Sequence, residues 1–262
     1  MKKYIVLLFL GLTGTLHAQF QPIILPVPNV DVYPNRNNWC SAAAAECVLK
    51  YKNINKGQCE IMNWIRTQPN SGYGGYPCCD PIPGWPSNEH PCDKGVPFGY
   101  YNEKVSVKKI LMHYSNNTLA SEALTYPLNT YNIKEALDQD RPIFAHWFYD
   151  TYESNAHAVV IRGIHISQNL VYYMDPDPDL YNGGYQFLPY NTFHIDGSRR
   201  WEGTLRLIDC SSRGYPCHCY NGEQDGDETG IDCGGACPPC GTPPPPPPPP
   251  AVHCSDCRGG QW

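Results

Sequence analysis

The chain has 262 residues, a formal net charge of −6 at pH 7 and a sequence pI near 5.8. Its basic residues form only short pairs such as Arg199-Arg200, so the sequence lacks the basic surface needed to bind nucleic acid or an anionic membrane. We therefore expect a protein, a peptide or a small molecule as the partner of a monomeric chain.

Residues 1–18 have the layout of a cleavable signal peptide. Two lysines precede an apolar run from Tyr4 to about Leu12, and a polar stretch then ends in Leu-His-Ala. Later segments lack the roughly 20 consecutive apolar residues that a membrane-spanning helix needs. The mature chain is expected to begin near Gln19 and to be secreted, into the periplasm or outside the cell.

The first half of the main region, residues 19–209, has helical periodicity. Ala44, Cys47, Val48 and Tyr51 recur at i, i+3, i+4 and i+7, which predicts an amphipathic helix. A second short helix is predicted over residues 60–66, and a third over 133–139. The stretch up to residue 105 is rich in Gly and Pro and predicts an irregular loop pinned by disulfides of unknown pairing. The cysteines that pin it are Cys59, Cys78, Cys79 and Cys92.

From Pro142 onward the pattern changes to strands, because short apolar and aromatic runs alternate with turn residues. The predicted strands are PIFAHWF, HAVVIRGI, LVYYMD, GYQFLPY and GTLRLID. Helices followed by strands predict an α+β fold of two lobes, a helical N-terminal lobe and a C-terminal lobe formed by an antiparallel β-sheet.

Beyond residue 209 the composition changes. Residues 210–241 hold many cysteines and few large apolar side chains, so we expect a small acidic module stapled by disulfides. Residues 242–250 are nearly all proline and predict a polyproline linker of about 25 Å. Residues 251–262 form a tail too short for a core.

Two patterns in the C-terminal segments also occur in metal sites. The zinc pattern consists of the pairs Cys237-x-x-Cys240 and Cys254-x-x-Cys257. Eight prolines separate these pairs in an oxidising compartment, so disulfides are favoured over zinc. The calcium pattern consists of Asp225, Asp227 and Thr229. The distal glutamate of a calcium loop is absent, so we predict no cofactor and keep calcium at these residues as the alternative.

Cys40 lies in the first turn of the predicted alanine-rich helix, where unpaired N–H groups and the helix dipole favour a thiolate. A nucleophilic thiol also needs a base, and the base needs a group that orients it. His157 opens one strand and Asp175 ends the next, so a turn between them brings both together to within about two residues of register. Asp175 is expected to accept the imidazole Nδ1 hydrogen, which leaves the other nitrogen for the thiol.

Each of these residues also has a structural interpretation. The fourteen cysteines favour Cys40 as a half-cystine. A free Cys40 leaves thirteen, an odd number, and Cys47 on the apolar face of the same helix is the natural second free thiol. His146, inside an apolar run, and His165, near the turn, are rival bases. Asp-Pro is also a common start of a turn, but Asp175 ends the apolar strand and is preferred.

These segments together resemble the papain-like cysteine peptidases, especially a compact bacterial secreted branch with Asp as the third residue. The resemblance spans about residues 28–208. It rests on Cys40 before an alanine-rich helix, HAVVIRGI, YYMDPD, DQDRPIFAHW, and the pair Cys78-Cys79 followed by Cys92. The sequence departs from the family pattern at Asn35, where the family has glutamine, and at Ser41, where it has an aromatic residue.

The resemblance implies a two-lobed papain-like fold over residues 19–209 and a catalytic mechanism. Cys40 would be the nucleophile, His157 the general base and acid, and Asp175 the orienting carboxylate. The amide of Asn35 and the Cys40 N–H would form the oxyanion hole. The predicted function is a secreted cysteine endopeptidase that acts on a protein or peptide through a thioester.

Two alternatives remain. A transglutaminase-like acyl transferase uses the same Cys, His, Asp order, although the interval of 117 residues (157 minus 40) is longer than such enzymes commonly have. A catalytically inactive papain-like domain would serve binding or adhesion.

Overall fold

The structure is a computed structural model that describes residues 21–241, except 70, 74, 84–89, 101–102, 104, 150–155, 179–182, 211–213, 221–223 and 225–226. The predicted signal peptide, the polyproline linker and the C-terminal tail lie outside the described residues. Every helix in the described part is too short or too polar to cross a membrane.

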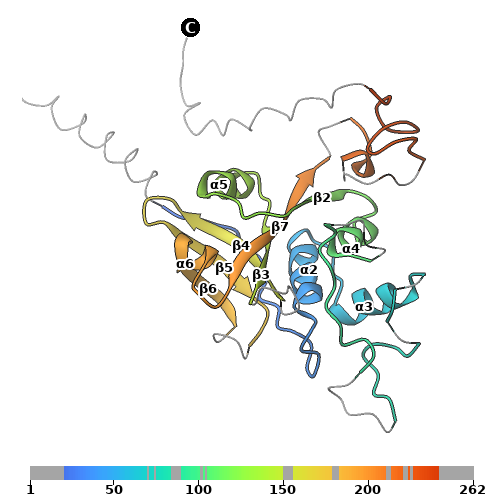
Figure 1. The fold of residues 1–262 in the computed structure, drawn as a ribbon, viewed down its shortest axis with the longest axis horizontal. Coiled ribbons are helices and arrows are strands. Elements are labelled where there is room, and N and C mark those ends of the chain that lie inside the picture. Colours follow the sequence, from blue (N-terminus) through green and yellow to red (C-terminus); the bar gives the residue numbers. More distant parts are fainter. Residues whose placement is uncertain are drawn as a thin grey trace, which may run out of the picture.

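Three helices lie together on one side of the molecule (Figure 1). They are α2 (Cys40–Tyr51), α3 (Gln58–Thr67) and α4 (Val107–Tyr114). Residues 40–49 of α2 are all buried, because this helix packs against the sheet and against both α3 and α4. Its alanines allow this close approach on several sides. The predicted helix at this position is therefore confirmed.

The other half of the molecule is one seven-stranded sheet with the order β2-β7-β3-β4-β5-β6, and β1 pairs with β4. All of these pairings are antiparallel. The strands are β1 (Ile23–Ile24), β2 (Leu119–Leu124), β3 (Ile143–Phe148), β4 (Ala156–His165), β5 (Leu170–Asp175), β6 (Gly184–Pro189) and β7 (Arg200–Asp209). The five predicted strands correspond to β3 to β7, which confirms the α+β class.

Five elements of the described part were missing from the sequence prediction: β1, β2, α4, the short helix α6 (Tyr190–His194) and the 3-10 helix η2 (Cys217–Tyr220). The segment of β2, LASEAL, is made of residues with good helix propensity, but it forms six antiparallel pairs with β7. The order of helices first and strands second is therefore interrupted, because β2 precedes α5 (Thr130–Asp138). Tertiary pairing overrides local propensity here.

The N-terminal segment is an integral part of the sheet. β1 lies so close to β4 that a Cβ on Gly163 would be 2.6 Å from the Ile23 carbonyl oxygen. Farther along, the Val32 N–H donates to the Pro176 carbonyl oxygen at 2.7 Å. Residues 23–32 are thus fixed along the sheet before the chain reaches α2.

The C-terminal module is held by three disulfides and packs at the end of β7 that is remote from Arg200. The disulfides are Cys210–Cys217, Cys219–Cys237 and Cys233–Cys240. Cys210 and Cys217 pack against Ala120 of β2, and Figure 1 shows the module beyond the same sheet edge. This arrangement agrees with a stapled segment that lacks an apolar core of its own.

The module uses parts of both metal patterns for internal contacts. Cys237 and Cys240 are disulfide-bonded, and Cys254 and Cys257 lie outside the described residues. Asp227 accepts a hydrogen bond from the Ala236 N–H at 2.9 Å, and the Thr229 hydroxyl lies 3.6 Å from the sulfur of Cys240. Asp225 is outside the described residues, so calcium at these residues stays the untested alternative to the prediction of no cofactor.

Candidate active site

The candidate site begins at the first residue of α2, and the disulfide-pinned loop fixes the segment that leads to it. Cys59 pairs with Cys79, and Cys78 pairs with Cys92, which are the pairings that the sequence left open. Two side chains of this segment donate hydrogen bonds to backbone carbonyl groups of the loop. The Arg36 guanidinium donates to the Cys78 carbonyl oxygen at 3.0 and 3.2 Å, and the Trp39 indole donates to that of Cys92 at 2.7 Å.

A second set of polar contacts joins this segment to α3. The side-chain oxygen of Gln58 accepts from the Tyr33 N–H at 2.8 Å, while its amide nitrogen donates to the Asp31 carbonyl oxygen at 2.9 Å. The same amide nitrogen also lies 2.9 Å from the carboxylate of Glu46, in the middle of α2. The segment that leads into α2 is therefore held by the disulfide-pinned loop and by α3.

The N-terminus of α2 is left open toward the site. No side chain of the described residues caps it, and its first turn holds no acidic residue. The first helical hydrogen bond runs from the Ala43 N–H to the Trp39 carbonyl oxygen. The preceding N–H groups therefore lack an intrahelical acceptor, and the helix dipole adds a partial positive charge at Cys40.

His157 and Asp175 meet as the sequence predicted. Nε2 of His157 lies 2.7 Å from Oδ1 of Asp175, and both residues are buried, at 4% and 0% exposure. Val160 pairs with Met174, so Asp175 lies opposite the residue before Val160, two positions from His157. This offset is within the tolerance of two residues that the sequence allowed.

The imidazole is oriented in the opposite way to that expected. Nε2 contacts the Asp175 carboxylate, so the hydrogen bond between His157 and the Cys40 thiol falls to Nδ1. The expectation that Asp175 accepts the Nδ1 hydrogen is wrong. Nδ1 is the ring nitrogen nearer the backbone of β4, the strand that packs against α2, while Nε2 reaches across to Asp175 at the end of β5.

The electrostatics of the site favour a thiolate and imidazolium pair. Burial by itself raises the pKa of Cys40, but the hydrogen bond and positive charge of His157 reverse this effect. The Ala158 backbone and the Ser41 hydroxyl contribute in the same direction, so the Cys40 pKa falls below its ordinary value. Burial lowers the pKa of His157, yet contacts with Asp175 and Cys40 outweigh it and raise that pKa well above the usual range.

The carboxylate of Asp175 is held from its own strand end. Oδ1 also accepts from the Asp177 N–H at 3.0 Å, which fixes the carboxylate relative to β5. Oδ2 is buried and has no hydrogen-bond partner in the described part of the chain. Because this carboxylate is buried and accepts few hydrogen bonds, its attraction to the charged form of His157 is strong.

Trp147 is a site residue that the sequence reasoning missed. It lies opposite His157 in the register of β3 and β4, and the two rings are 6.2 Å apart. Its indole donates to the Phe193 carbonyl oxygen at 3.0 Å, and the Arg199 guanidinium lies 3.9 Å from its ring centroid. The fully buried indole walls off one side of the imidazole. Its position directly opposite His157 in antiparallel strands is the signal that could have found it.

The rival bases lie elsewhere. His146 stacks on Phe98 with ring centroids 4.5 Å apart, and burial together with the charge of His157 lowers its pKa to about 4. His165 pairs with Leu170 at the turn, eight residues along β4 from His157, a distance of roughly 26 Å. Neither imidazole is placed to serve Cys40.

Asn35 is not brought into contact with the Cys40 sulfur. The groups that bond to this sulfur are His157, the Ala158 backbone and Ser41. Asn35 is exposed with φ of 60°, and its carbonyl oxygen accepts from Arg36 at 3.0 Å. The oxyanion role of its amide therefore stays a prediction, and the open N–H groups of α2 are the donors that the structure places at the thiol.

Cys40 and Cys47 are the two free cysteines of the described part, as the odd count predicted for a free Cys40. Cys47 lies two turns along α2, and its thiol donates to the Pro28 carbonyl oxygen at 3.2 Å. Burial, and secondarily the charge of Glu46, raises its pKa to about 12. Cys47 is therefore an inert, neutral thiol.

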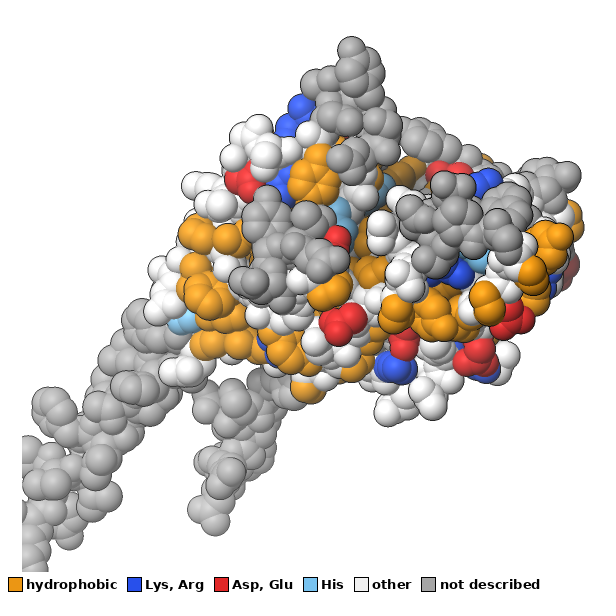
Figure 2. All heavy atoms as spheres, turned by 90° about the horizontal axis from the view of Figure 1, so that it is seen from below, with side chains coloured by type: hydrophobic (Ala, Val, Ile, Leu, Met, Phe, Trp, Pro, Cys, Tyr) orange, Lys and Arg blue, Asp and Glu red, His pale blue; other side chains and the backbone are white. Residues whose placement is uncertain are grey.

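The face of the molecule seen in Figure 2 has no concentration of one charge among its described side chains. Figure 2 shows acidic and basic side chains mixed along its lower rim, with hydrophobic side chains over much of the rest.

The chain matches one protein family over most of its length. Residues 24–206 match the family described as Peptidase_C39 like, and no curated protein matches the chain. One similar solved structure is a double glycine motif protease from an AMS/PCAT transporter in complex with the leader peptide. It is 16% identical, with a TM-score of 0.37, over 70% of this chain and 92% of that chain.

A second similar structure is the peptidase domain of Streptococcus ComA, a bi-functional ABC transporter involved in a quorum sensing pathway. It is 13% identical, with a TM-score of 0.40, over 69% of this chain and 96% of that chain. Both likenesses are weak, so the family assignment rests on the match over residues 24–206.

Proposed function

Because the chain belongs to the Peptidase_C39 like family, a family of papain-like cysteine peptidases, we propose that it is an exported endopeptidase that uses Cys40, His157 and Asp175. The single observation that carries this proposal is the buried line of contacts from the Cys40 thiol through the His157 imidazole to the Asp175 carboxylate. This line starts at an open helix N-terminus, which is where an anionic sulfur is most stabilised.

In the acylation half of the reaction, the Cys40 thiolate attacks the carbonyl carbon of the scissile peptide bond. The carbonyl oxygen becomes negatively charged and faces the N–H groups at the start of α2. The His157 imidazolium then gives its proton to the leaving nitrogen, and the C–N bond breaks. The first product leaves as an amine, and the second stays bound to Cys40 as a thioester.

In the deacylation half, neutral His157 takes a proton from water while the water oxygen attacks the thioester carbonyl. The C–S bond breaks, the carboxylic acid product leaves, and the thiolate and imidazolium pair is restored. Asp175 keeps the ring in place through both halves because its carboxylate holds Nε2. Trp147 keeps solvent away from one side of the ring.

Export is supported by the disulfides. The described part holds five of them, and structural disulfides persist in oxidising compartments. Cys40 stays unpaired in such a chain because it is buried at the start of α2 beside His157. The proposed compartment is the periplasm or the space outside the cell.

The proposal is tested by digestion of a mixed peptide library with the purified chain that lacks residues 1–18, followed by mass spectrometry of the products. We expect new termini inside the peptides with the wild-type protein and none with Cys40→Ala. Incorporation of an added amine in place of water would favour an acyl transferase. Peptide binding without cleavage by the correctly folded wild-type protein would favour a binding domain and contradict the proposal.

A further inference from the structure

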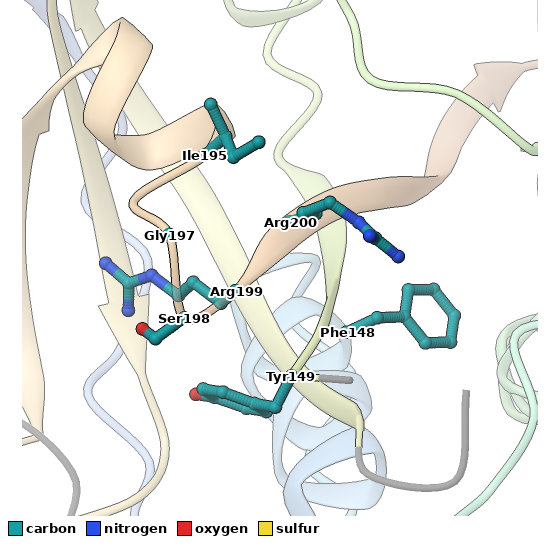
Figure 3. A pocket seen from close by; sticks show the side chains of 7 residues that line it. All are labelled: Phe148, Tyr149, Ile195, Gly197, Ser198, Arg199 and Arg200. Carbon is teal, nitrogen blue, oxygen red and sulfur yellow. The ribbon is translucent and has the colours of Figure 1, made fainter. Parts of the chain in front are cut away.

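A pocket of about 260 Å³ lies beside the candidate active site and plays no part in the chemistry described above (Figure 3). Its lining residues are Phe148, Tyr149, Ile195, Gly197, Ser198, Arg199 and Arg200. They come from the end of β3 and from the turn between α6 and β7. The volume is below the roughly 300–1,000 Å³ of sites that enclose a whole small-molecule ligand, so it suits one side chain or one chain end of a bound peptide.

The strand register places this pocket next to His157. Phe148 pairs with Ala156, the residue before His157, and on its other side with Arg200. Arg199, the next lining residue, stacks on Trp147, whose ring is the neighbour of the imidazole. The pocket therefore lies at the same end of β3 and β4 as His157.

The wall formed by residues 195–200 is preorganised. The Asp196 carboxylate accepts from the N–H groups of Ser198 and Arg199 at 3.0 Å each, and from the Ser198 hydroxyl at 2.8 Å. Gly197 has φ of 84°, a conformation that favours glycine. Ile195 and Arg200 close the turn through a β-bridge. A peptide would thus meet a wall that is already formed.

The two arginines of the lining differ in burial and in how strongly each is ion-paired within the chain. Arg199 is 3% exposed and forms an ion pair with Asp196, with Nε 2.9 Å from the carboxylate oxygen. Arg200 has a half-exposed side chain, and its partner Glu202 is equally exposed, so this pair is worth little in water. Among the described residues, the lining contains no acidic side chain. Arg200 is therefore the cation that a bound carboxylate can reach.

We propose that this pocket binds a carboxylate of the peptide substrate, within the first two residues after the scissile bond, and that Arg200 pairs with it. The inference rests on the proposed function, because His157 delivers its proton to the leaving amine and the leaving side of the peptide must therefore face His157. Phe148, Tyr149 and Ile195 supply apolar contacts for the stem of the side chain. The carboxylate can belong to an Asp or Glu side chain or to the C-terminus of a short peptide.

The test compares peptides that share one cleavable sequence and differ only after the scissile bond. One set carries Glu, Gln or Lys there with an amidated C-terminus, and a second set carries Gln with a free or an amidated C-terminus placed at the same distance. We expect kcat/KM to be about tenfold higher for the carboxylate form than for the neutral one, the size of one charge-assisted hydrogen bond, and lowest for Lys. The two sets separate the side-chain source from the C-terminal source.

Arg200→Gln should remove this preference and leave kcat/KM for the neutral peptide within about twofold. Arg206→Gln is the matched control, because Arg206 lies on the same strand, is similarly exposed and pairs with Glu122 at 2.6 Å. It lies six residues away, roughly 20 Å along β7, and should keep the preference.

The outcomes separate the two proposals. Equal kcat/KM for Glu and Gln peptides, or a preference that survives in Arg200→Gln, overturns the carboxylate pocket while cleavage itself stands. Absence of any cleavage overturns the proposed function instead. In that case, binding of fluorescent Glu and Gln peptides to the Cys40→Ala protein decides the pocket, since tighter binding of the Glu peptide that is lost on adding Arg200→Gln supports it and equal binding contradicts it.

Discussion

The two free thiols of α2 are buried in one helix, two turns apart, yet their surroundings shift their pKa values in opposite directions. Cys40 meets an imidazolium and the open N-terminus of the helix, and its pKa is lowered. Cys47 meets a backbone carbonyl and lies next to Glu46, and its pKa is raised to about 12. Burial raises the pKa of both thiols, so the difference between the two pKa values comes from the charged and polar groups around each sulfur. A free cysteine in a disulfide-rich chain is therefore a nucleophile only where such groups offset its burial.

The largest effect is expected from removal of His157, the group that makes the pKa of Cys40 differ from that of Cys47. His157→Ala should lower kcat/KM by at least about 10³-fold, because both the base and the acid of the reaction are lost. The Cys40 pKa should rise toward that of Cys47, since burial is then no longer opposed by the imidazolium. Steady-state hydrolysis of a peptide found in the library digest measures the first change.

His165→Ala is the matched control for that variant. It removes a buried imidazole from the other end of the same strand and should leave kcat/KM within about twofold. An equal loss of activity in both variants would mean that the effect arises from damage to β4 and not from the base.

Removal of the Asp175 carboxylate should narrow the difference between the pKa values of Cys40 and Cys47 without abolishing it. Asp175→Ala is expected to lower kcat/KM about 10²-fold or more, and Asp175→Asn less, because an amide oxygen can still accept from Nε2. Loss of the carboxylate lowers the raised pKa of His157, and the imidazolium is needed below that pKa. The alkaline limb of the pH profile of kcat/KM should therefore move to lower pH. An unchanged alkaline limb in Asp175→Ala would contradict this role.

A third variant tests whether the loop that anchors the start of α2 supports the reactive thiol. Replacing Cys78 and Cys92 by Ala opens a loop of 14 residues and should cost about 3 kcal/mol of unfolding free energy. It should also lower kcat/KM by several-fold, because Arg36 and Trp39 lose their fixed carbonyl acceptors. Chemical denaturation and peptide hydrolysis measure the two effects.

The C-terminal module offers the comparison for this variant. Removing the disulfide Cys233–Cys240 opens a loop in a region that packs at the other end of β7 and should leave kcat/KM unchanged. Equal activity of the two double variants would show that the anchors at Cys78 and Cys92 do not affect the site.

The smallest effect is expected from the inert thiol. Cys47→Ala should reduce the free energy of unfolding by about 1 kcal/mol, because a buried sulfur and its hydrogen bond to Pro28 are lost. It should leave kcat/KM unchanged, which denaturation curves and kinetics on the same sample can show. A large loss of activity with normal stability would assign Cys47 a chemical role that the structure does not support.

The sequence predicted those parts of the molecule whose periodicity is strong. The i, i+3, i+4, i+7 pattern marked α2, and five apolar runs marked β3 to β7, because buried faces repeat with the geometry of each element. The approach of His157 to Asp175 followed from two adjacent strands and a turn. These features depend on residues that are close together in the sequence, so the sequence alone can predict them.

The remaining features depend on contacts between distant segments. The helix-forming residues of β2 become a strand only because β7, about 85 residues later, supplies the pairing partner. Which cysteine pairs with which, and which nitrogen of His157 faces Cys40, depend on the packing of loops and on a bulge between Ile161 and Gly163. The cover provided by Trp147 follows from the register of β3 against β4. One sequence holds no local signal for the pairing of the cysteines or for the orientation of the imidazole.

The central claim is that the Cys40 thiol is activated by His157 while Cys47 in the same helix is not. The most direct test is the rate of alkylation of each cysteine by iodoacetamide as a function of pH, read by mass spectrometry of peptides from the native protein. We predict that Cys40 reacts stoichiometrically well below pH 9, the ordinary pKa of a thiol, and that Cys47 stays unmodified. Reaction of Cys40 only near or above pH 9, or as slowly as that of Cys47, would contradict the account.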